Sequence, residues 1–266
     1  MDFLISYQHI FRPAAFIGLF VLFAFAELRF PLSQRKTSRS YQWLTNLAFA
    51  IINSLLLKLL IPLLAVGVAA YAAEHQLGLF NVINIPAGIS FILALLLLDL
   101  IIYCQHVLFH KVPLLWRLHR MHHTEIRLDV SSALRFHPIE ILLSMFIKMA
   151  FVLLLGAPVA AVIVFEILLN GFALFNHSNL KLPKNVDRLL RKLVVTPEIH
   201  WIHHSPIVKE TNSNYGFNLI IWDKLFATYI SQPSVEYSKM QQGLFQFGLQ
   251  KSLTLSELLL LPFRKK

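Results

Sequence analysis

The stretch SFILALLLLDLIIYCQHVLFH, residues 90–110, joins a long apolar run to two histidines. About 20 consecutive apolar residues are enough for one helix to cross the hydrocarbon core of a bilayer. His106 and His110 are four residues apart, so a helix places both imidazoles on the same face, one turn apart. The stretch therefore predicts a membrane-spanning helix with a pair of candidate metal ligands at one end.

The composition of the whole chain extends this prediction to the rest of the fold. Of 266 residues, 56% are hydrophobic and 14% are charged, and the mean hydropathy is +0.61. Soluble domains are about 45–50% apolar and about 25% charged, so these proportions exclude a water-soluble enzyme as well as a disordered chain. The single cysteine, Cys104, excludes an intrachain disulfide and any cysteine-rich zinc or iron–sulfur centre. We expect a polytopic membrane protein.

Apolar runs of spanning length recur along the chain. In one of them Lys58 and Pro62 indicate a tilt or a kink, and Gly156-Ala157-Pro158 divides another into the two arms of a hairpin. The predicted fold is all-α, with three long transmembrane helices, a helical hairpin and a cytoplasmic helical cap, in a single membrane-embedded domain over residues 1–266. The expected ranges are about 10–28, 43–73 and 90–110 for the three helices, 139–176 for the hairpin, and 111–137 with 177–266 for the cap.

The distribution of cationic residues predicts the orientation in the membrane. Lys and Arg number 24 against 14 Asp and Glu, a net charge of +10. The loop 29–42 holds Arg29, Arg35, Lys36 and Arg39 with no acid, and cytoplasmic loops carry such an excess of cations. We therefore expect an integral multi-pass protein of a bacterial inner membrane or the endoplasmic reticulum, with its histidines on the cytoplasmic side. No nucleic-acid partner is expected, because the cations lie beside apolar spans.

Histidine is concentrated in the predicted cap and at the ends of the spans, where ten of the 12 histidines fall between 106 and 204. The pattern HxxHH occurs twice, as His119-Arg-Met-His122-His123 and as His200-Trp-Ile-His203-His204. Helical spacings of three and four residues bring imidazoles to one face, as two ligands of one metal require. Nine or ten imidazoles exceed one coordination sphere, so two ions are predicted.

The donor set narrows the choice of metal. Nitrogen donors without thiolate and with few carboxylates suit Fe, Zn or Cu and not Mg or Ca. The HExxH of zinc peptidases and the paired Glu-x-x-His of ferritin-like bundles are absent from the sequence. A dinuclear iron centre that activates O2 against the C–H bonds of a lipid is the favoured interpretation. A metal-binding or metal-transport membrane protein and a transmembrane bis-histidine haem protein stay open as alternatives.

The segments around the histidines resemble the fatty acid hydroxylase/sterol desaturase superfamily. The resemblance covers about 90–230, and it continues into Asn214-Tyr215-Gly216 and Trp222-Asp223. Its main segments are 99–110, 115–123, 134–140, 176–179 and 200–204. The resemblance implies an integral-membrane, non-haem di-iron oxidoreductase that hydroxylates, desaturates or demethylates lipids with O2 and two electrons.

Carried over residue by residue, the resemblance implies nine metal ligands. These are His106, His110, His119, His122, His123, His177, His200, His203 and His204. Two further residues are candidate catalytic residues. Asp99 lies seven residues before His106, two turns away on the same helix face, and is expected to orient a ligand or handle a proton. His137 would supply a tenth ligand or support a neighbouring one.

The expected cofactors are two Fe ions, which Zn can replace in isolated protein, together with O2. The sequence shows no cytochrome b5-like segment, so we expect electrons from NAD(P)H to arrive through a separate carrier of the cytochrome b5 or ferredoxin type. Arg188, Arg191 and Lys192 are candidates for docking an acidic carrier. The expected substrate is a lipid, and the sequence does not distinguish hydroxylation from desaturation.

Polar residues within the hairpin are expected to belong to the same site. Glu166, Asn170 and Asn176 follow one another along its returning arm and are expected to line the cavity beside the metals. Lys148 is expected to snorkel or to pair with Glu166. Glu140 is interpreted as a residue that fixes the fold of the cap.

Overall fold

The computed structural model describes residues 5–34, 39–248 and 252–264, and in these residues it contains helices and no sheet strand. Arg35 and Lys36, two of the four cations of the predicted basic loop, lie outside the described residues. Five segments of the described chain are long and apolar enough to cross a membrane. The chain is thus an all-α multi-pass membrane protein, as predicted.

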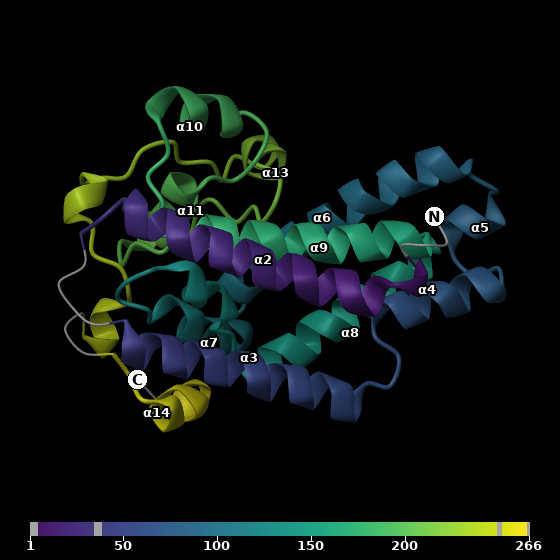
Figure 1. Cartoon of the computed structure of the whole chain (residues 1–266), viewed down its shortest axis with the longest axis horizontal. Coiled ribbons are helices and arrows are strands. Elements are labelled where there is room, and N and C mark those ends of the chain that lie inside the picture. The colour runs from purple at the N-terminus through teal and green to yellow at the C-terminus, as the bar shows by residue number, and fades with distance from the viewer. Residues whose placement is uncertain (1–4, 35–38, 249–251, 265–266) are drawn as a thin grey trace.

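Five long helices form the body of the molecule (Figure 1). They are α2 Gln8–Arg29, α3 Ser40–Leu60, α6 Ala87–Lys111, α8 Pro138–Leu155 and α9 Val159–His177. α2, α6 and both arms of the hairpin lie close to the ranges predicted from the sequence. α9 packs against both α2 and α6, so the returning arm of the hairpin lies at the centre of the bundle.

The second predicted span, 43–73, consists of two helices and not one. α3 ends at Leu60, and α4 (Ala65–Glu74) starts only after a break at Pro62. Proline has no backbone N–H to donate and its ring clashes with the carbonyl one turn earlier. Ile61 takes extended backbone, with φ −125° and ψ 93°, as residues before proline do. The predicted kink is therefore a full interruption, after which α4 packs against α8 and α9.

Two glycines hold the tip of the hairpin. Gly156 ends α8 in the left-handed conformation, with φ 62°, and a Cβ there would lie 2.6 Å from Leu77 O. Gly78, with φ 90°, has no more room, because its Cβ would lie 2.1 Å from Gly156 N. This close approach packs the hairpin tip against the loop before α5 (Leu79–Val82), at the end of α9 away from His177.

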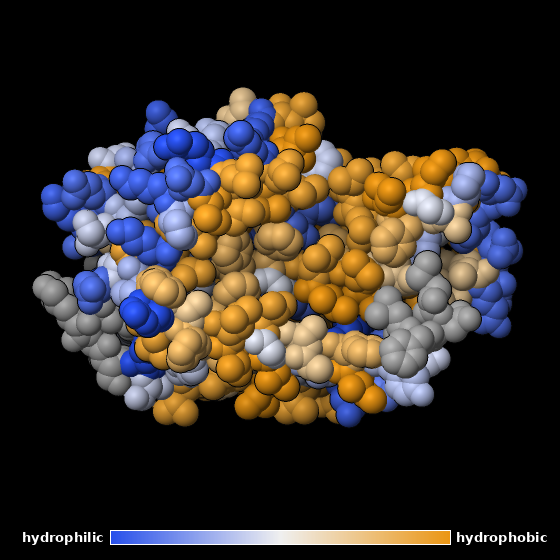
Figure 2. Space-filling model, turned by 45° about the horizontal axis from the view of Figure 1, so that its top comes forward, coloured by the Kyte–Doolittle hydropathy of each residue, from blue (hydrophilic) through white to orange (hydrophobic). Residues whose placement is uncertain are grey.

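Short helices form the rest of the molecule and gather at the left end in Figure 1, with α10 above and α14 below. They are α7 Pro113–His123, η1 Val130–Leu134, α10 Lys184–Leu190, α11 Pro197–His203, α12 Val208–Thr211, α13 Ile221–Leu225, η2 Tyr237–Lys239, η3 Phe245–Phe247, α14 Leu255–Leu260 and η4 Leu261–Phe263. In Figure 2 hydrophobic residues cover the middle of the visible face, and hydrophilic residues gather at both ends. This is the surface that a membrane-embedded helical body requires.

Small residues are buried between the helices of the bundle. Ala69 of α4, Ala94 of α6 and Ala161 of α9 are fully buried. Inside a bilayer apolar side chains gain little by leaving lipid, so helices associate through close packing of small residues. In the cap, Ile199 and Trp201 of α11 belong to a separate buried cluster, which fixes the helix that carries the last histidine motif.

Candidate metal centre

α6 and α7 carry five of the nine predicted ligands. The end of α6 presents one pair of histidines one turn apart, and α7 presents a triplet. Pro113 occupies the first turn of α7, where its missing N–H leaves no bond unmade. The five histidines, all buried, are His106, His110, His119, His122 and His123.

α9 and α11 carry the other four. His177 is the last residue of α9. Pro197 begins α11, which contains His200 and His203, while His204 is its C-terminal cap, with φ −85° and ψ 7°. These four side chains are also buried, each at most 1% exposed. Packing therefore brings histidines from four separate helices into one buried cluster.

The nine imidazoles form two groups, within each of which the candidate ligand atoms lie no more than 4.8 Å apart. The first group is His106, His110, His119, His123 and His203, and the second is His122, His177, His200 and His204. In each HxxHH motif the first and last histidines share a group, and the middle one joins the other group. The groups adjoin, because the rings of His123 and His204 stack with centroids 4.4 Å apart. Neither group includes a carboxylate from the described residues.

Five of the imidazoles are fixed in orientation by a hydrogen bond at Nδ1. His119 Nδ1 lies 2.6 Å from Glu140 Oε1. Four others donate to backbone carbonyls at 2.7–3.2 Å, namely His106 to Tyr215, His122 to Arg135, His177 to Ala173 and His203 to Ser213. Metal-ligating histidines are oriented by such bonds at the nitrogen that faces away from the metal.

The opposite ring nitrogens face one another without a proton between them. Nε2 of His106 is 3.1 Å from Nε2 of His119, and Nε2 of His122 is 2.9 Å from Nε2 of His177. Because Nδ1 of each ring donates its hydrogen, each Nε2 carries a lone pair. Two lone pairs this close repel unless a cation lies between them. A metal–nitrogen bond of about 2.1 Å places two ligand nitrogens at right angles about 3.0 Å apart, so both groups fit a bound metal.

Three further imidazoles lack a hydrogen bond at either ring nitrogen. His110, His123 and His204 are buried, and their ring nitrogens have no hydrogen-bond partner among the described residues. Buried polar atoms without a partner are rare in folded proteins. A metal ion in each group would give each of these three rings a partner for one of its nitrogens.

Burial favours the neutral form of five imidazoles of the cap. It lowers the pKa of His122, His123, His200 and His204 well below the ordinary value, and neighbouring imidazoles lower it further. Burial also lowers the pKa of His203 to about 3, against the opposing effect of its bond to the Ser213 carbonyl. Neutral imidazole is the form that binds a metal.

Asp99 lies outside both histidine groups. Its Oδ2 accepts a hydrogen bond from Trp222 Nε1 at 2.7 Å and another from Leu219 N at 3.3 Å. The carboxylate is buried, with 3% of its residue surface exposed. Asp99 thus ties the middle of α6 to the segment around α13, and its catalytic role stays a prediction.

His137 also lies outside both groups, as the N-terminal cap of α8. Its Nδ1 accepts a hydrogen bond from Ile139 N at 3.2 Å, and its Nε2 lies 3.1 Å from Leu259 O, to which it donates. Both ring nitrogens are therefore occupied by the backbone, which leaves no free lone pair for a metal. A catalytic role for His137 stays a prediction, and the geometry favours the supporting alternative.

Glu140 makes a contact with a candidate ligand that the sequence interpretation does not predict. It was interpreted as a fold-fixing residue, whereas it bonds to the imidazole of His119. Its position in the first turn of α8, just after His137, was the available signal. The carbonyls of Tyr215 and Ser213 had no such signal, because every residue carries a carbonyl.

A cavity of about 680 Å³ runs from the first histidine group into the helical bundle. His106 and His119 line one end, and its walls come from α2, α3, α6, α8 and α9. Glu166 and Asn170 line it, as predicted. Asn176 is not among the lining residues and instead donates from Nδ2 to a backbone carbonyl at 2.6 Å. A volume of this size suits an organic ligand.

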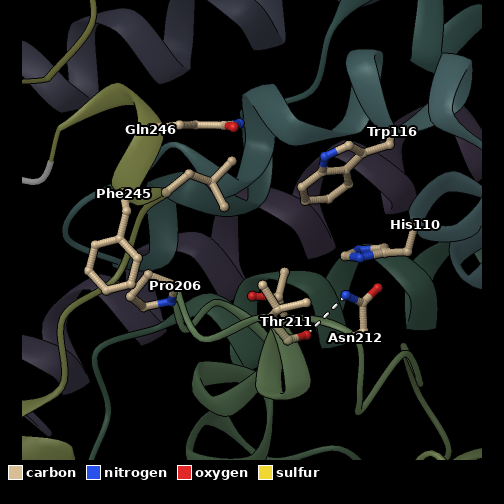
Figure 3. Close-up of a pocket in the computed structure, with 9 residues that line it drawn as sticks. His110, Trp116, Pro206, Thr211, Asn212, Phe245 and Gln246 are labelled. Atoms are coloured by element: carbon tan, nitrogen blue, oxygen red, sulfur yellow. Dashed lines mark hydrogen bonds between the residues drawn. The ribbon is translucent and has the colours of Figure 1, made fainter. Parts of the chain in front are cut away.

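A second, smaller pocket of about 320 Å³ reaches the same group from the cap (Figure 3). His110 and Trp116 lie on one side, with ring centroids 4.8 Å apart, and Phe245 lies across from them (Figure 3). Asn212 lines the pocket beside His110 and donates to the Val208 carbonyl at 2.9 Å. The first histidine group is therefore bordered by one cavity in the bundle and one in the cap.

Comparisons with known proteins agree with this site. The chain is 33% identical over 148 residues to the ornithine lipid hydroxylase OlsE of Rhizobium tropici, which covers 56% of this chain and 44% of that protein. It is 29% identical over 145 residues to the human alkylglycerol monooxygenase, 53% of this chain and 30% of that protein. It is 29% identical over 169 residues to the fatty acid hydroxylase vlmA of Lecanicillium sp, 56% of this chain and 44% of that protein.

The matched segments span less than half the length of these relatives. No solved structure gives a significant match. The model of the fatty acid hydroxylase family matches residues 91–228, which is more than half of the chain and includes every histidine of both groups. The chain therefore belongs to the fatty acid hydroxylase family.

Proposed function

We propose that the chain is an O2-dependent lipid hydroxylase or desaturase with a histidine-held di-iron centre. The observation that supports this most directly is the pair of adjoining imidazole groups at the end of a cavity between apolar helices. Metal transport requires weak, exchangeable ligands near the middle of the membrane, whereas these imidazoles are buried and five of them are fixed in orientation by a hydrogen bond at Nδ1. The names of the relatives, which are lipid hydroxylases and a monooxygenase, support the same activity.

In this proposal each histidine group holds one ion. Bound iron would supply the activation of O2 that an unreactive C–H bond requires. Glu140 and four backbone carbonyls hold five of the imidazoles in fixed orientations, so that these ligand atoms need not reorganise during turnover. The cavity holds the lipid with a C–H bond toward His106 and His119, and the apolar residues of its lining limit the access of water.

Asp99 and His137 act by holding other parts of the site in place. Asp99 holds the segment around α13 against α6 through Trp222. His137 caps α8, the helix whose first turn carries Glu140, and in this way it sets the carboxylate that orients His119. The spans and the cap act together as one catalytic domain.

A separate carrier would deliver two electrons from NAD(P)H on the cytoplasmic side, in a bacterial inner membrane or the endoplasmic reticulum. Arg188 and Lys192 are exposed on the cap and suit an acidic carrier of the cytochrome b5 or ferredoxin type. Arg191 is engaged in ion pairs with Asp187 and Glu198, so its charge is already paired within the cap and the proposed docking residues are Arg188 and Lys192.

Metal analysis and lipid analysis together test the proposal. The full chain, purified in detergent, is analysed for iron and zinc per chain, then supplied with a lipid extract, a reductant with carrier protein and isotopically labelled O2. We expect two ions per chain, and either labelled oxygen in a lipid or a new double bond. Protein stripped by a chelator serves as the control and should form no product. Iron-loaded protein that forms neither product, or stripped protein that forms as much, would overturn the proposal.

A further inference from the structure

The end of the large cavity away from the histidines is charged, although it lies between apolar helices. Arg12 of α2, Lys58 of α3 and Lys148 of α8 line it, together with Glu166 of α9. Glu140, the other acid of the lining, is bonded to His119 at the histidine end. The far end of the cavity therefore carries three cations and one carboxylate among the described residues.

Glu166 cannot neutralise this set. Its two oxygens contact Lys148 Nζ at 2.6 Å and Arg12 at 2.5 Å, so one carboxylate already serves two cations. The Glu166 side chain is 3% exposed, whereas those of Lys148 and Arg12 are 11% and 30% exposed. Charges within a membrane are costly unless they are paired. The two cations keep free surface, and an anion could complete their pairing.

The position of this cluster along the helices sets its distance from the histidines. Lys148 lies eight residues after Glu140 on α8, which is about 12 Å at 1.5 Å per residue. Glu140 contacts His119 directly. Between the two ends the lining includes the apolar residues Ile102 and Met145, together with Ser144, which accepts a hydrogen bond from Gln105. The cavity thus has a histidine end, a mostly apolar middle and a cationic end.

We propose that Arg12 and Lys148 bind the anionic group of the lipid substrate, a carboxylate or a phosphate. This inference rests on the proposed function in treating the cavity as the lipid site, and it adds the class of lipid. The substrate is an anionic lipid whose charged group lies about 12 Å from the histidine end, with its hydrocarbon chain lying between. Glu166 contacts both cations and competes with the lipid anion for them.

Equilibrium binding without turnover tests the proposal. The full chain in neutral detergent, without reductant, is titrated with radiolabelled hexadecanoate, hexadecyl phosphate and the neutral hexadecanol at pH 8. We expect at least one anion to bind about tenfold more tightly than hexadecanol, which corresponds to about 1.4 kcal/mol. A stronger preference for the phosphate would assign the site to a phospholipid, and a stronger preference for the carboxylate to a fatty acid or acyl amino acid. Equal binding of all three probes would overturn the proposal.

Variants separate the cationic end from the metals, since a carboxylate also binds metal directly. Lys148→Gln should reduce the preference to less than about twofold while metal content stays unchanged, and Lys148→Arg should restore it. Lys209→Gln, the same change at an exposed cap residue, should leave the preference as in wild type. Glu166→Gln should increase the preference, because it removes the competing carboxylate. An anion preference that survives Lys148→Gln in metal-loaded protein would assign it to the metals and refute the proposal.

The outcomes also distinguish this inference from the proposed function. A chain that prefers anions through Lys148 but forms no oxidised lipid would contradict the hydroxylase and leave the anion site in place. A chain that oxidises lipids but shows no dependence on Lys148 or Arg12 would contradict the anion site alone. Thermal melting of every variant identifies those that fail to fold. If Lys148→Gln fails to fold, the comparison of Lys148→Arg and Glu166→Gln with wild type provides the decisive test.

Discussion

Replacing Glu140 should weaken metal binding without removing a ligand. Its carboxylate lies 2.6 Å from His119 Nδ1, and both side chains are almost fully buried, at 4% and 3% exposure. A charged acceptor makes a hydrogen bond roughly twice as strong as a neutral one. Glu140→Gln keeps the size and an acceptor oxygen but removes the charge, whereas Glu140→Ala leaves the N–H of His119 without its acceptor.

The expected magnitudes follow from these contacts. Loss of the residue that orients a ligating histidine costs about 10- to 100-fold in metal affinity, which is about 1.4–2.7 kcal/mol. We expect this for Glu140→Ala and about fivefold to tenfold for Glu140→Gln, because a neutral hydrogen bond of about 1 kcal/mol remains. Competition with a coloured chelator, with metal content determined at each point, measures both changes.

Glu236→Gln is the matched control, since Glu236 is 71% exposed and pairs with Lys239 far from any histidine in sequence. It should bind metal as wild type does. Only the first histidine group contains His119, so one ion should weaken in the Glu140 variants and the other should not. Glu140→Ala protein that melts like wild type and binds both ions with unchanged affinity would refute the orienting role of Glu140.

Three further predictions concern other parts of the molecule. His203→Ala should lose one ion and nearly all activity, whereas His75→Ala, at the exposed end of α4, should keep both, and equal losses would contradict the single cluster. His137→Ala should keep both ions but unfold at a lower temperature, because it loses an N-cap worth about 1 kcal/mol. A missing ion in this variant would make His137 a ligand. Cysteines at Gln76 and Lys209, in a background without Cys104, should react with an impermeant reagent from opposite sides of the membrane, and labelling of both from one side would refute the predicted topology.

Much of the fold and the candidate ligands could be predicted from local pattern alone. Hydropathy and length determine that a segment such as 90–110 spans a membrane, because the hydrocarbon core has a fixed thickness. Spacing of three and four residues determines that histidines share a helix face. Neither argument needs to know where another helix lies. Spacing therefore pointed to eight of the nine candidate ligands, whereas His177, which has no other histidine within four residues, was named only through the resemblance to the family.

The tertiary structure alone decided how those residues are shared and supported. His119 and His123 join one group while His122 joins the other, a division that depends on which helices surround α7 and not on spacing within it. Glu140 reaches His119 across 21 positions of sequence. Arg12 reaches Glu166 across the bundle. A local pattern encodes backbone conformation and burial, whereas contacts between distant residues exist only after packing has placed their helices side by side, and no periodicity in the chain records them.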